Sequence, residues 1–269
     1  MCVRPLLALG ALLVGCSGPC WPAEGDPRAL QLVEEIIQAL GGPAFRSMRT
    51  RVQRGRLFSF ESEELRGLAN ATIYTEFVDA PTQADPKVLY LRERQSFGKT
   101  REQWAVLFNE KGAWEITYRG ARPLTEDVLE RYRTSRKYDV FYILLRRLDE
   151  PGMLVQYKGR DIVDNQPAEV LEFIDAQNRA VTVAVHYSTK LPLQQSLTRR
   201  DQYGIPHVEV TTFGKYRDAG GGVQLPLVIQ RYQDKQRVFA LFAEEVTVNA
   251  PLKPELFELP PKIKLLENP

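Results

Sequence analysis

The second half of the chain is an almost unbroken series of segments in which apolar and polar residues alternate. The segment Ala180–Tyr187 has valines at positions 181, 183 and 185, separated by polar or small residues. Because successive side chains of a strand point to opposite faces, this period of two predicts a strand with one buried face. Such segments recur about every ten residues and are joined by turns containing Gly or Asp. The pattern predicts one large, curved antiparallel sheet.

Strands are expected on both sides of a helical segment in the middle of the chain. The expected strands of the first half are Arg51–Phe60, Gly67–Val78, Lys87–Glu93, Trp104–Phe108 and Ala113–Arg119. Those of the second half are Ala168–Ile174, Ala180–Tyr187, Leu191–Thr198, His207–Tyr216, Val223–Tyr232 and Val238–Val248. No linker of low complexity divides the chain and no repeat is evident, so we expect a single domain over residues 26–269.

Two helical segments are expected. Asp26 is a suitable N-cap, Pro27 suits the first turn, and Gly41-Gly42 is a typical end for the helix between them. The second segment runs from about Thr125 to Leu148. Each has an apolar side that must be covered. We therefore expect a mainly β (α+β) fold, an incomplete, strongly curved antiparallel β-barrel with both helices covering its concave side.

The first residues are typical of an export signal. Residues 1–4 carry one positive charge and Pro5–Val14 form an apolar run. In a helix this run spans about 15 Å, roughly half of a bilayer core, so it suits a signal peptide and not a membrane-spanning helix. Leu13-Val14-Gly15-Cys16 resembles the lipobox of bacterial lipoproteins. We expect a signal peptide over residues 1–15, a lipid on Cys16 and a tether over residues 16–25.

A lipid on Cys16 would hold the protein at a membrane. Each buried methylene contributes about 0.8 kcal/mol, so two or three acyl chains would anchor it permanently. We expect a location in the bacterial cell envelope, at the outer membrane and facing the periplasm. Ordinary secretion with a cut after Ala23 is the alternative, but Trp21 then stands where a small residue is wanted.

The composition lacks the residues that most catalytic and metal sites need. The formal net charge is +2, so no strong field would recruit nucleic acid. The only histidines are His186 and His207, and all three cysteines lie within the first 20 residues. No motif for a phosphate-binding loop, a nucleophile elbow or a metalloprotease is present. We expect no catalytic residue, metal or cofactor, and therefore no enzyme.

Two groups of charged residues leave alternatives open. Asp161 with Asp164, or Glu172 with Asp175, could be carboxylate pairs, but solvated strand faces and turns explain them better. The basic stretch formed by arginines 49, 51, 54 and 56 is expected on a solvent-facing strand. Contact of these arginines with lipid phosphates or an acidic partner is the alternative.

Short segments spread in order over most of the chain carry a resemblance to a known family. They are Ala39-Leu40-Gly41-Gly42, Pro86-Lys87-Val88, Gly112-Ala113-Trp114, Gly159–Asp164, Ala168–Phe173, Thr189-Lys190-Leu191-Pro192, Gly222–Pro226, Val246–Asn249 and Phe257–Pro260. This series resembles the LolA/LolB-type superfamily of outer-membrane lipoprotein-sorting proteins. The resemblance implies an incomplete barrel whose apolar cavity, covered by helices, takes acyl chains. A lipidated chain would be closer to the outer-membrane receptor of that superfamily than to its carrier.

The expected cavity would be lined by apolar residues of the strands. The candidates are Trp114, Ile116, Leu171, Phe173, Val183, Val185, Val210 and Leu227. The same side chains could instead fill a closed core, and the sequence does not separate the two.

The leading hypothesis is a membrane-anchored, periplasmic binding protein for the acyl chains of lipoproteins or lipids, acting as a monomer in outer-membrane lipoprotein sorting. An envelope sensor or protein-interaction module on the same fold is the first alternative. A hydrolase with an unrecognised site is the second.

Overall fold

The computed structural model describes residues 24–79, 85, 88–200 and 203–267. The predicted signal peptide, Cys16 and most of the predicted tether lie outside the described residues. Glu24 and Gly25, which the sequence assigns to the tether, form a short strand. No helix within the described residues is long and apolar enough to cross a membrane.

Most of the described chain forms one sheet. Its strands are β1 (Glu24–Gly25), β2 (Thr50–Glu61), β3 (Glu64–Phe77), β4 (Leu91–Phe97), β5 (Trp104–Asn109), β6 (Gly112–Thr117), β7 (Gly120–Pro123), β8 (Leu154–Val163), β9 (Gln166–Ile174), β10 (Ala180–His186), β11 (Pro192–Arg200), β12 (Pro206–Asp218), β13 (Gln224–Gln233) and β14 (Gln236–Val248). The order in the sheet is β1-β8-β9-β10-β11-β12-β13-β14-β2-β3-β4-β5-β6-β7. Among the strands named here, all from the described residues, only β1 and β8 pair in parallel.

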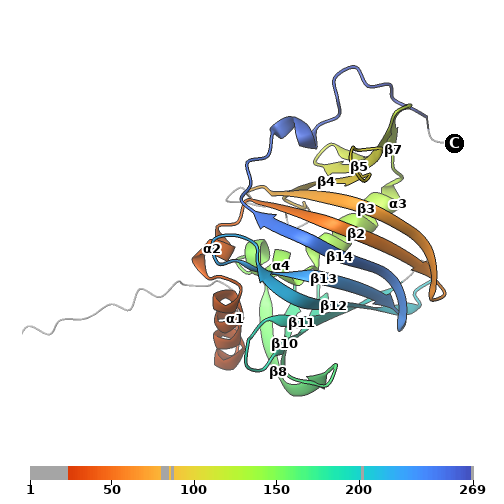
Figure 1. Cartoon of the computed structure of the whole chain (residues 1–269). Coiled ribbons are helices and arrows are strands. Elements are labelled where there is room, and N and C mark those ends of the chain that lie inside the picture. The colour runs from red at the N-terminus through yellow and green to blue at the C-terminus, as the bar shows by residue number, and fades with distance from the viewer. Residues whose placement is uncertain (1–23, 80–84, 86–87, 201–202, 268–269) are drawn as a thin grey trace, which may run out of the picture.

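The sheet curves without closing, and its helices lie against one face (Figure 1). This confirms the predicted fold class of an incomplete, curved antiparallel barrel. We call the face that carries the helices the concave face and the opposite one the outer face. Figure 1 views the sheet from its outer face, with α3 and α4 behind the strands.

The N-terminal helix forms as its sequence predicts. It is α1 (Pro27–Ala39), and the side chain of Asp26 accepts a hydrogen bond from the backbone N–H of Ala29 at 2.9 Å. Gly41 and Gly42 adopt φ values of 121° and 56°, which side-chain-bearing residues rarely adopt, and so end the helix. A short helix, α2 (Pro43–Arg46), follows.

The prediction of one helix from Thr125 to Leu148 is wrong. The segment contains α3 (Glu126–Lys137), α4 (Val140–Tyr142) and the π-helical turn η1 (Ile143–Arg147). Asp139 is extended, and its carboxylate accepts hydrogen bonds from the backbone N–H groups of Phe141 and Tyr142. A side chain that caps a new helix start interrupts the helix before it.

Two of the expected strands are placed differently. The strand expected at Lys87–Glu93 is β4 at Leu91–Phe97, because the backbone N–H of Tyr90 bonds to the Tyr142 hydroxyl, and pairing with β3 begins at Leu91. The strand expected at Ala113–Arg119 is β6, which ends at Thr117, and a further strand, β7, follows it. Gly120, with a φ of 142°, follows the tight turn that separates them.

The main core lies between the concave face and the helices α1, α4 and η1. Its fully buried members include Leu32, Ile36, Val140, Leu144, Leu171 and Val183, each 0% exposed. A smaller core lies on the outer face of β5–β7. It contains Ala105, Leu107, Ile116 and Ala121, and Leu259 and Ile263 of the C-terminal segment cover it. That segment includes the short helix η2 (Pro254–Phe257).

One buried carboxylate ties α1 to the sheet. Glu169 in β9 is 0% exposed and forms ion pairs with Arg28 of α1 and with Lys190. The hydroxyl of Tyr157 donates a third hydrogen bond to it at 3.2 Å. Burial alone would raise the pKa of Glu169, but the hydrogen bonds from Lys190 and Arg28 outweigh burial, and the pKa is lowered.

We expect Glu169→Gln to lower the free energy of unfolding at pH 7 by about 1.5–3 kcal/mol, as for other hydrogen bonds to charged groups. The folded-state pKa of Glu169 lies below its unfolded value of 4.5. Its contribution is therefore complete above pH 4.5 and is lost as the pH falls through the folded pKa. Urea unfolding at pH 7 and pH 3 measures the difference, which should shrink at the lower pH.

The matched control is Glu172→Gln, because Glu172 lies on the same strand as Glu169 and pairs with the exposed Lys158 of β8. Its effect should not exceed about 1 kcal/mol. Equal effects of the two variants at pH 7 would contradict the role assigned to Glu169.

Candidate functional site

Four of the predicted cavity residues lie in the main core. Leu171 and Val183 face each other across β9 and β10, and Phe173 and Val185 share their face of the sheet. All four are at most 2% exposed and contact α1, α4 or their neighbours in the core. Leu227 is half-buried against the same core. None of these five residues lines either of the two pockets described below.

The other three predicted cavity residues are on the wrong face. Ala113 packs beneath α3 with Leu129, so Trp114 and Ile116 point to the outer face, where the C-terminal segment covers them. Val210 lies three positions before Phe213, whose ring is in the main core, so the Val210 side chain belongs to the outer face. Trp114 and Ile116 therefore lie outside the expected cavity, whereas Val210 points outward but also borders the space between α3 and the sheet.

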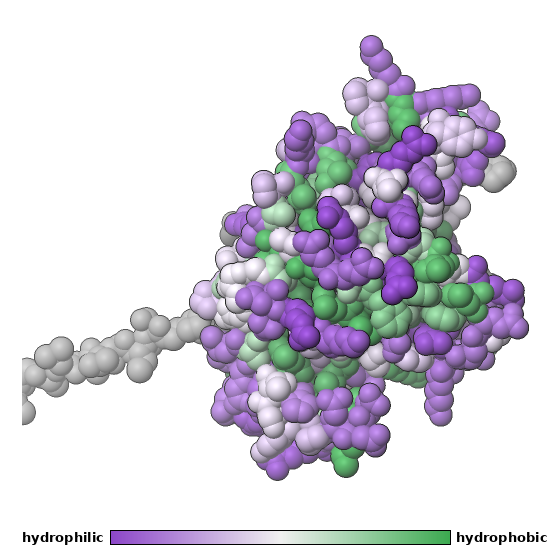
Figure 2. All heavy atoms as spheres, in the orientation of Figure 1, coloured by the Kyte–Doolittle hydropathy of each residue, from purple (hydrophilic) through white to green (hydrophobic). Residues whose placement is uncertain are grey.

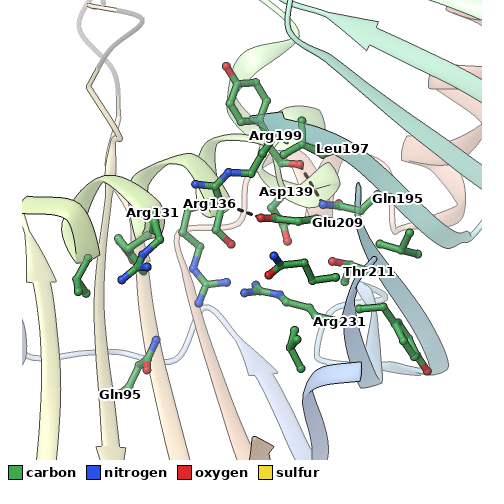
Figure 3. A pocket seen from close by; sticks show the side chains of 18 residues that line it. Gln95, Arg131, Arg136, Asp139, Gln195, Leu197, Arg199, Glu209, Thr211 and Arg231 are labelled. Carbon is green, nitrogen blue, oxygen red and sulfur yellow. Dashed lines mark hydrogen bonds and ion pairs between the residues drawn. The ribbon is translucent and has the colours of Figure 1, made fainter. Parts of the chain in front are cut away.

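An open pocket of about 340 Å³ separates α3 from the concave face (Figure 3). We call it the α3 pocket. Its lining residues are Gln95, Val128, Arg131, Tyr132, Ser135, Arg136, Tyr138, Asp139, Gln195, Leu197, Arg199, Glu209, Val210, Thr211, Arg231, Tyr232, Gln233 and Val238. They come from α3 and its end, and from β4 and β11–β14, so segments far apart in the sequence form its walls.

The helix wall of the α3 pocket is fixed by stacking and by an ion pair. Tyr132 stacks on Phe108 of β5 with ring centroids 3.6 Å apart. Arg136 forms a 2.7 Å ion pair with Glu93 of β4, which is 0% exposed. Burial raises the pKa of Tyr132 well above its ordinary value, and the nearby charge of Glu93 raises it further. The phenol therefore remains protonated.

The sheet wall is fixed by polar contacts of β11. Gln195 accepts a hydrogen bond from the backbone N–H of Val140 at 2.8 Å and donates one to the carbonyl of Tyr138 at 3.1 Å. Arg199 pairs with Glu209 of β12 at 3.1 Å. The two hydrogen bonds of Gln195 hold the break between α3 and α4 against the sheet, and the Arg199–Glu209 pair links β11 to β12.

Arg231 of β13 is different from the other arginines of the pocket. It has no hydrogen bond or ion pair with any of the described residues, and its guanidinium lies 5.4 Å from the centre of the Phe239 ring. Burial lowers the pKa of Arg231, and the positive charge of Arg136 lowers it further. Figure 3 shows the side chains of Arg136 and Arg231 pointing toward each other from opposite walls.

Several buried polar atoms beside the α3 pocket lack a partner among the described residues. They are Arg51 Nε, Thr75 Oγ1, Glu93 Oε2, Tyr132 Oη and Arg136 Nε. The first three belong to residues that face one another across β2, β3 and β4. Because buried polar groups are normally satisfied, this group of atoms marks a place where water or a polar ligand belongs.

Arg51 also corrects the interpretation of the basic stretch. It is 9% exposed and on the concave face, whereas Arg54 and Arg56 are exposed and lie near Glu245 and Glu244 on β14. Only the latter two fit the expected solvent-facing strand.

A second hollow lies on the outer face. This outer groove measures about 930 Å³, and its apolar lining includes Leu193, Val208, Val210, Val228 and Tyr232. Val210 therefore borders both hollows. Figure 2 shows the outer face, on which apolar and charged side chains are interspersed and apolar ones gather toward the β2–β3 hairpin.

Comparison with known proteins identifies the fold. No protein-family model matches the sequence, and no curated protein matches it. The crystal structure of a DUF1329 family protein from Desulfovibrio piger is similar over 86% of this chain and 97% of that chain, with a TM-score of 0.55 and 10% identity. A LolA superfamily protein from Nitrosomonas europaea is similar over 85% of this chain and 96% of that chain, with a TM-score of 0.51 and 12% identity. This chain has the LolA-type fold.

Most residues of the α3 pocket in this LolA-type fold are not recognisable from the sequence. Its polar members lie on strands next to apolar residues, and each occupies a position that is typical of a solvent-facing side chain. The only signal was the irregular phase of β12 and β13, where Thr211 and Arg231 occupy the face that carries Phe213.

Proposed function

We propose that the protein binds acyl chains of lipids or lipoproteins in the bacterial cell envelope and that it catalyses no reaction. The observation that supports this is the α3 pocket, which lies between a helix and the concave face of an open LolA-type sheet. Its volume is within the range of small-molecule sites. Val128, Leu197 and Val238 offer apolar wall, and burial of a chain against such surface contributes about 25 cal/mol per Å².

Of the helices on the concave face, α3 contributes few buried residues. Leu129 is the only buried residue that α3 contributes, whereas Val140, Phe141 and Tyr142 of α4 are all buried. Elements with few buried apolar contacts open most easily. Displacement of α3 would therefore expose less apolar surface than displacement of α4, although it would separate Arg136 from Glu93.

Native mass spectrometry of the full chain, extracted from membranes in mild detergent, tests the proposal. We expect a co-purifying species with the mass of an acyl lipid, and displacement of a fluorescent fatty acid from the stripped protein. A protein that carries no lipid and binds no fatty acid would overturn it.

A lipid anchor on Cys16 and a site at the outer membrane are part of the proposal. We expect Cys16→Ala to abolish labelling by radioactive palmitate and to move the protein from the membrane to the soluble fraction, because the lipobox cysteine is the acylated residue. Cell fractionation and labelling measure both effects. The control is Cys20→Ala, which should change neither. A wild-type protein that is soluble and begins at Glu24 would contradict the anchor.

The outer groove favours a second candidate function, that of a protein-interaction module or envelope sensor. Val208 is 45% exposed at its rim, and the groove is larger than the α3 pocket. Val208→Asp would place a charge there. If this variant no longer cross-links to a protein partner but still binds fatty acid, the second function is supported. If it keeps both the cross-linked partner and fatty-acid binding, the second function is contradicted.

A further inference from the structure

The geometry of the α3 pocket points to a bound oxyanion, a carboxylate or a phosphate, held between Arg136 and Arg231. The inference rests on the proposed function in one respect, since such a group would be the head of the amphiphile whose chain the pocket takes. An oxyanion held there would explain how the polar head of the ligand is recognised, which the apolar walls of the pocket cannot do.

Among the arginines that line the α3 pocket, Arg231 is the one without an ion pair to a described residue. Arg131 pairs with Asp127 at 3.0 Å, Arg199 with Glu209 at 3.1 Å, and Arg136 with Glu93 at 2.7 Å. Asp139 is the remaining lining carboxylate, and its Oδ1 accepts the backbone N–H groups that begin α4. The charge of Arg231 therefore has no carboxylate within 4.0 Å among the described residues.

The free donors of the two arginines converge on one space. A guanidinium has five N–H donors in a planar fork that matches a carboxylate or phosphate. No described residue accepts a hydrogen bond from the guanidinium of Arg231. The Nε atom of Arg136 is buried and also has no partner among the described residues. The two side chains approach from opposite walls (Figure 3). Two like charges that face each other in this way repel, and an anion between them removes the repulsion.

The surroundings hold Arg231 in this position. The ring of Phe239 on the neighbouring strand lies beneath its guanidinium, which favours a fixed orientation over a solvent-directed one. Arg51 lies close enough for Asp139 and Glu93 to act on its charge. Four arginines, at positions 51, 136, 199 and 231, are thus set against three carboxylates, Glu93, Asp139 and Glu209. A cation or a neutral head group would leave this excess positive charge uncompensated.

Binding measurements on the full chain with three probes test the inference: inorganic phosphate, dodecyl phosphate and dodecanol. Isothermal calorimetry of the delipidated protein should show dodecyl phosphate binding at least tenfold more tightly than dodecanol. Arg231→Gln should abolish that preference and leave dodecanol binding unchanged, which also shows that the variant is folded. The control Arg133→Gln removes an arginine of the same helix that pairs with Glu126 and does not line the α3 pocket, and it should keep the preference.

The outcomes separate this inference from the proposed function. If dodecanol binds the wild type as tightly as dodecyl phosphate, the oxyanion site is wrong while the acyl-chain proposal stands. If phosphate alone binds as tightly as dodecyl phosphate and dodecanol does not bind, the oxyanion site stands, free phosphate is its source, and the acyl-chain proposal fails. If Arg231→Gln keeps the preference, the assignment of Arg231 is wrong.

Discussion

Val183→Glu should destabilise the protein by about 3–5 kcal/mol, enough to prevent folding of many domains of this size. Val183 is 0% exposed, and its cross-strand neighbours are Leu171 and Gln195. Neither neighbour carries a positive charge that could pair with a new carboxylate, so the charge would be buried alone. Urea or thermal unfolding measures the loss.

Val208→Glu is the matched control, because it makes the same change on the outer face at a residue that is 45% exposed. Its effect should be within about 0.5 kcal/mol. If Val183→Glu were as stable as the wild type and bound no fatty acid, the interior would admit water, and the packed core described above would instead be a cavity.

Asp175→Ala should cost about 2–4 kcal/mol, because it removes the acceptor at the centre of a buried hydrogen-bond network, while Arg147 keeps its ion pair with Glu150. The Oδ2 atom of Asp175 accepts a 2.7 Å hydrogen bond from the hydroxyl of Tyr138 and lies 3.4 Å from the guanidinium of Arg147. Arg147 is 1% exposed. Burial and the hydrogen bond to Asp175 raise the pKa of Tyr138 to about 12, so this phenol stays a donor at physiological pH.

The Oδ1 atom of Asp175 also accepts hydrogen bonds from the backbone N–H groups of Gln177 and Arg179, so the same substitution loosens the turn before β10. Denaturant unfolding of Asp175→Ala measures the sum of these effects. Asp161→Ala is the control, because Asp161 is exposed and bonds only to the adjacent backbone N–H of Ile162. Equal stability of the two variants would contradict the network.

The sequence predicts the elements whose cause is local. Asp26, Pro27 and the two glycines at 41 and 42 define α1 because caps and turns depend on neighbouring residues alone. The alternation in β10 predicts its strand for the same reason. The break before α4 is different, since Asp139 competes with a helix that the flanking residues favour, and Gln195 from a distant strand supports that break.

The candidate site was less predictable because its parts depend on long-range packing. The outward position of Trp114 follows from coverage by Leu259 and Ile263, near the other end of the chain. The sequence does not show whether an arginine such as Arg231 forms an ion pair with a carboxylate in the folded protein. The resemblance to the LolA/LolB-type superfamily predicted the architecture, but not which side chains line its pocket.

The ends of the chain protect the two margins of the sheet (Figure 1). At one margin β1 pairs with β8 over only two residues, and beyond it β8 carries the charged residues Lys158, Arg160 and Asp161. At the other margin, the four-residue strand β7 pairs with the C-terminal segment through a single bridge between Ala121 and Leu265. Short, charged or covered margins offer little backbone to a foreign strand. Copies of the protein at high concentration would therefore gain little from strand exchange, and the broad open sheet can persist beside neighbouring copies without pairing with them.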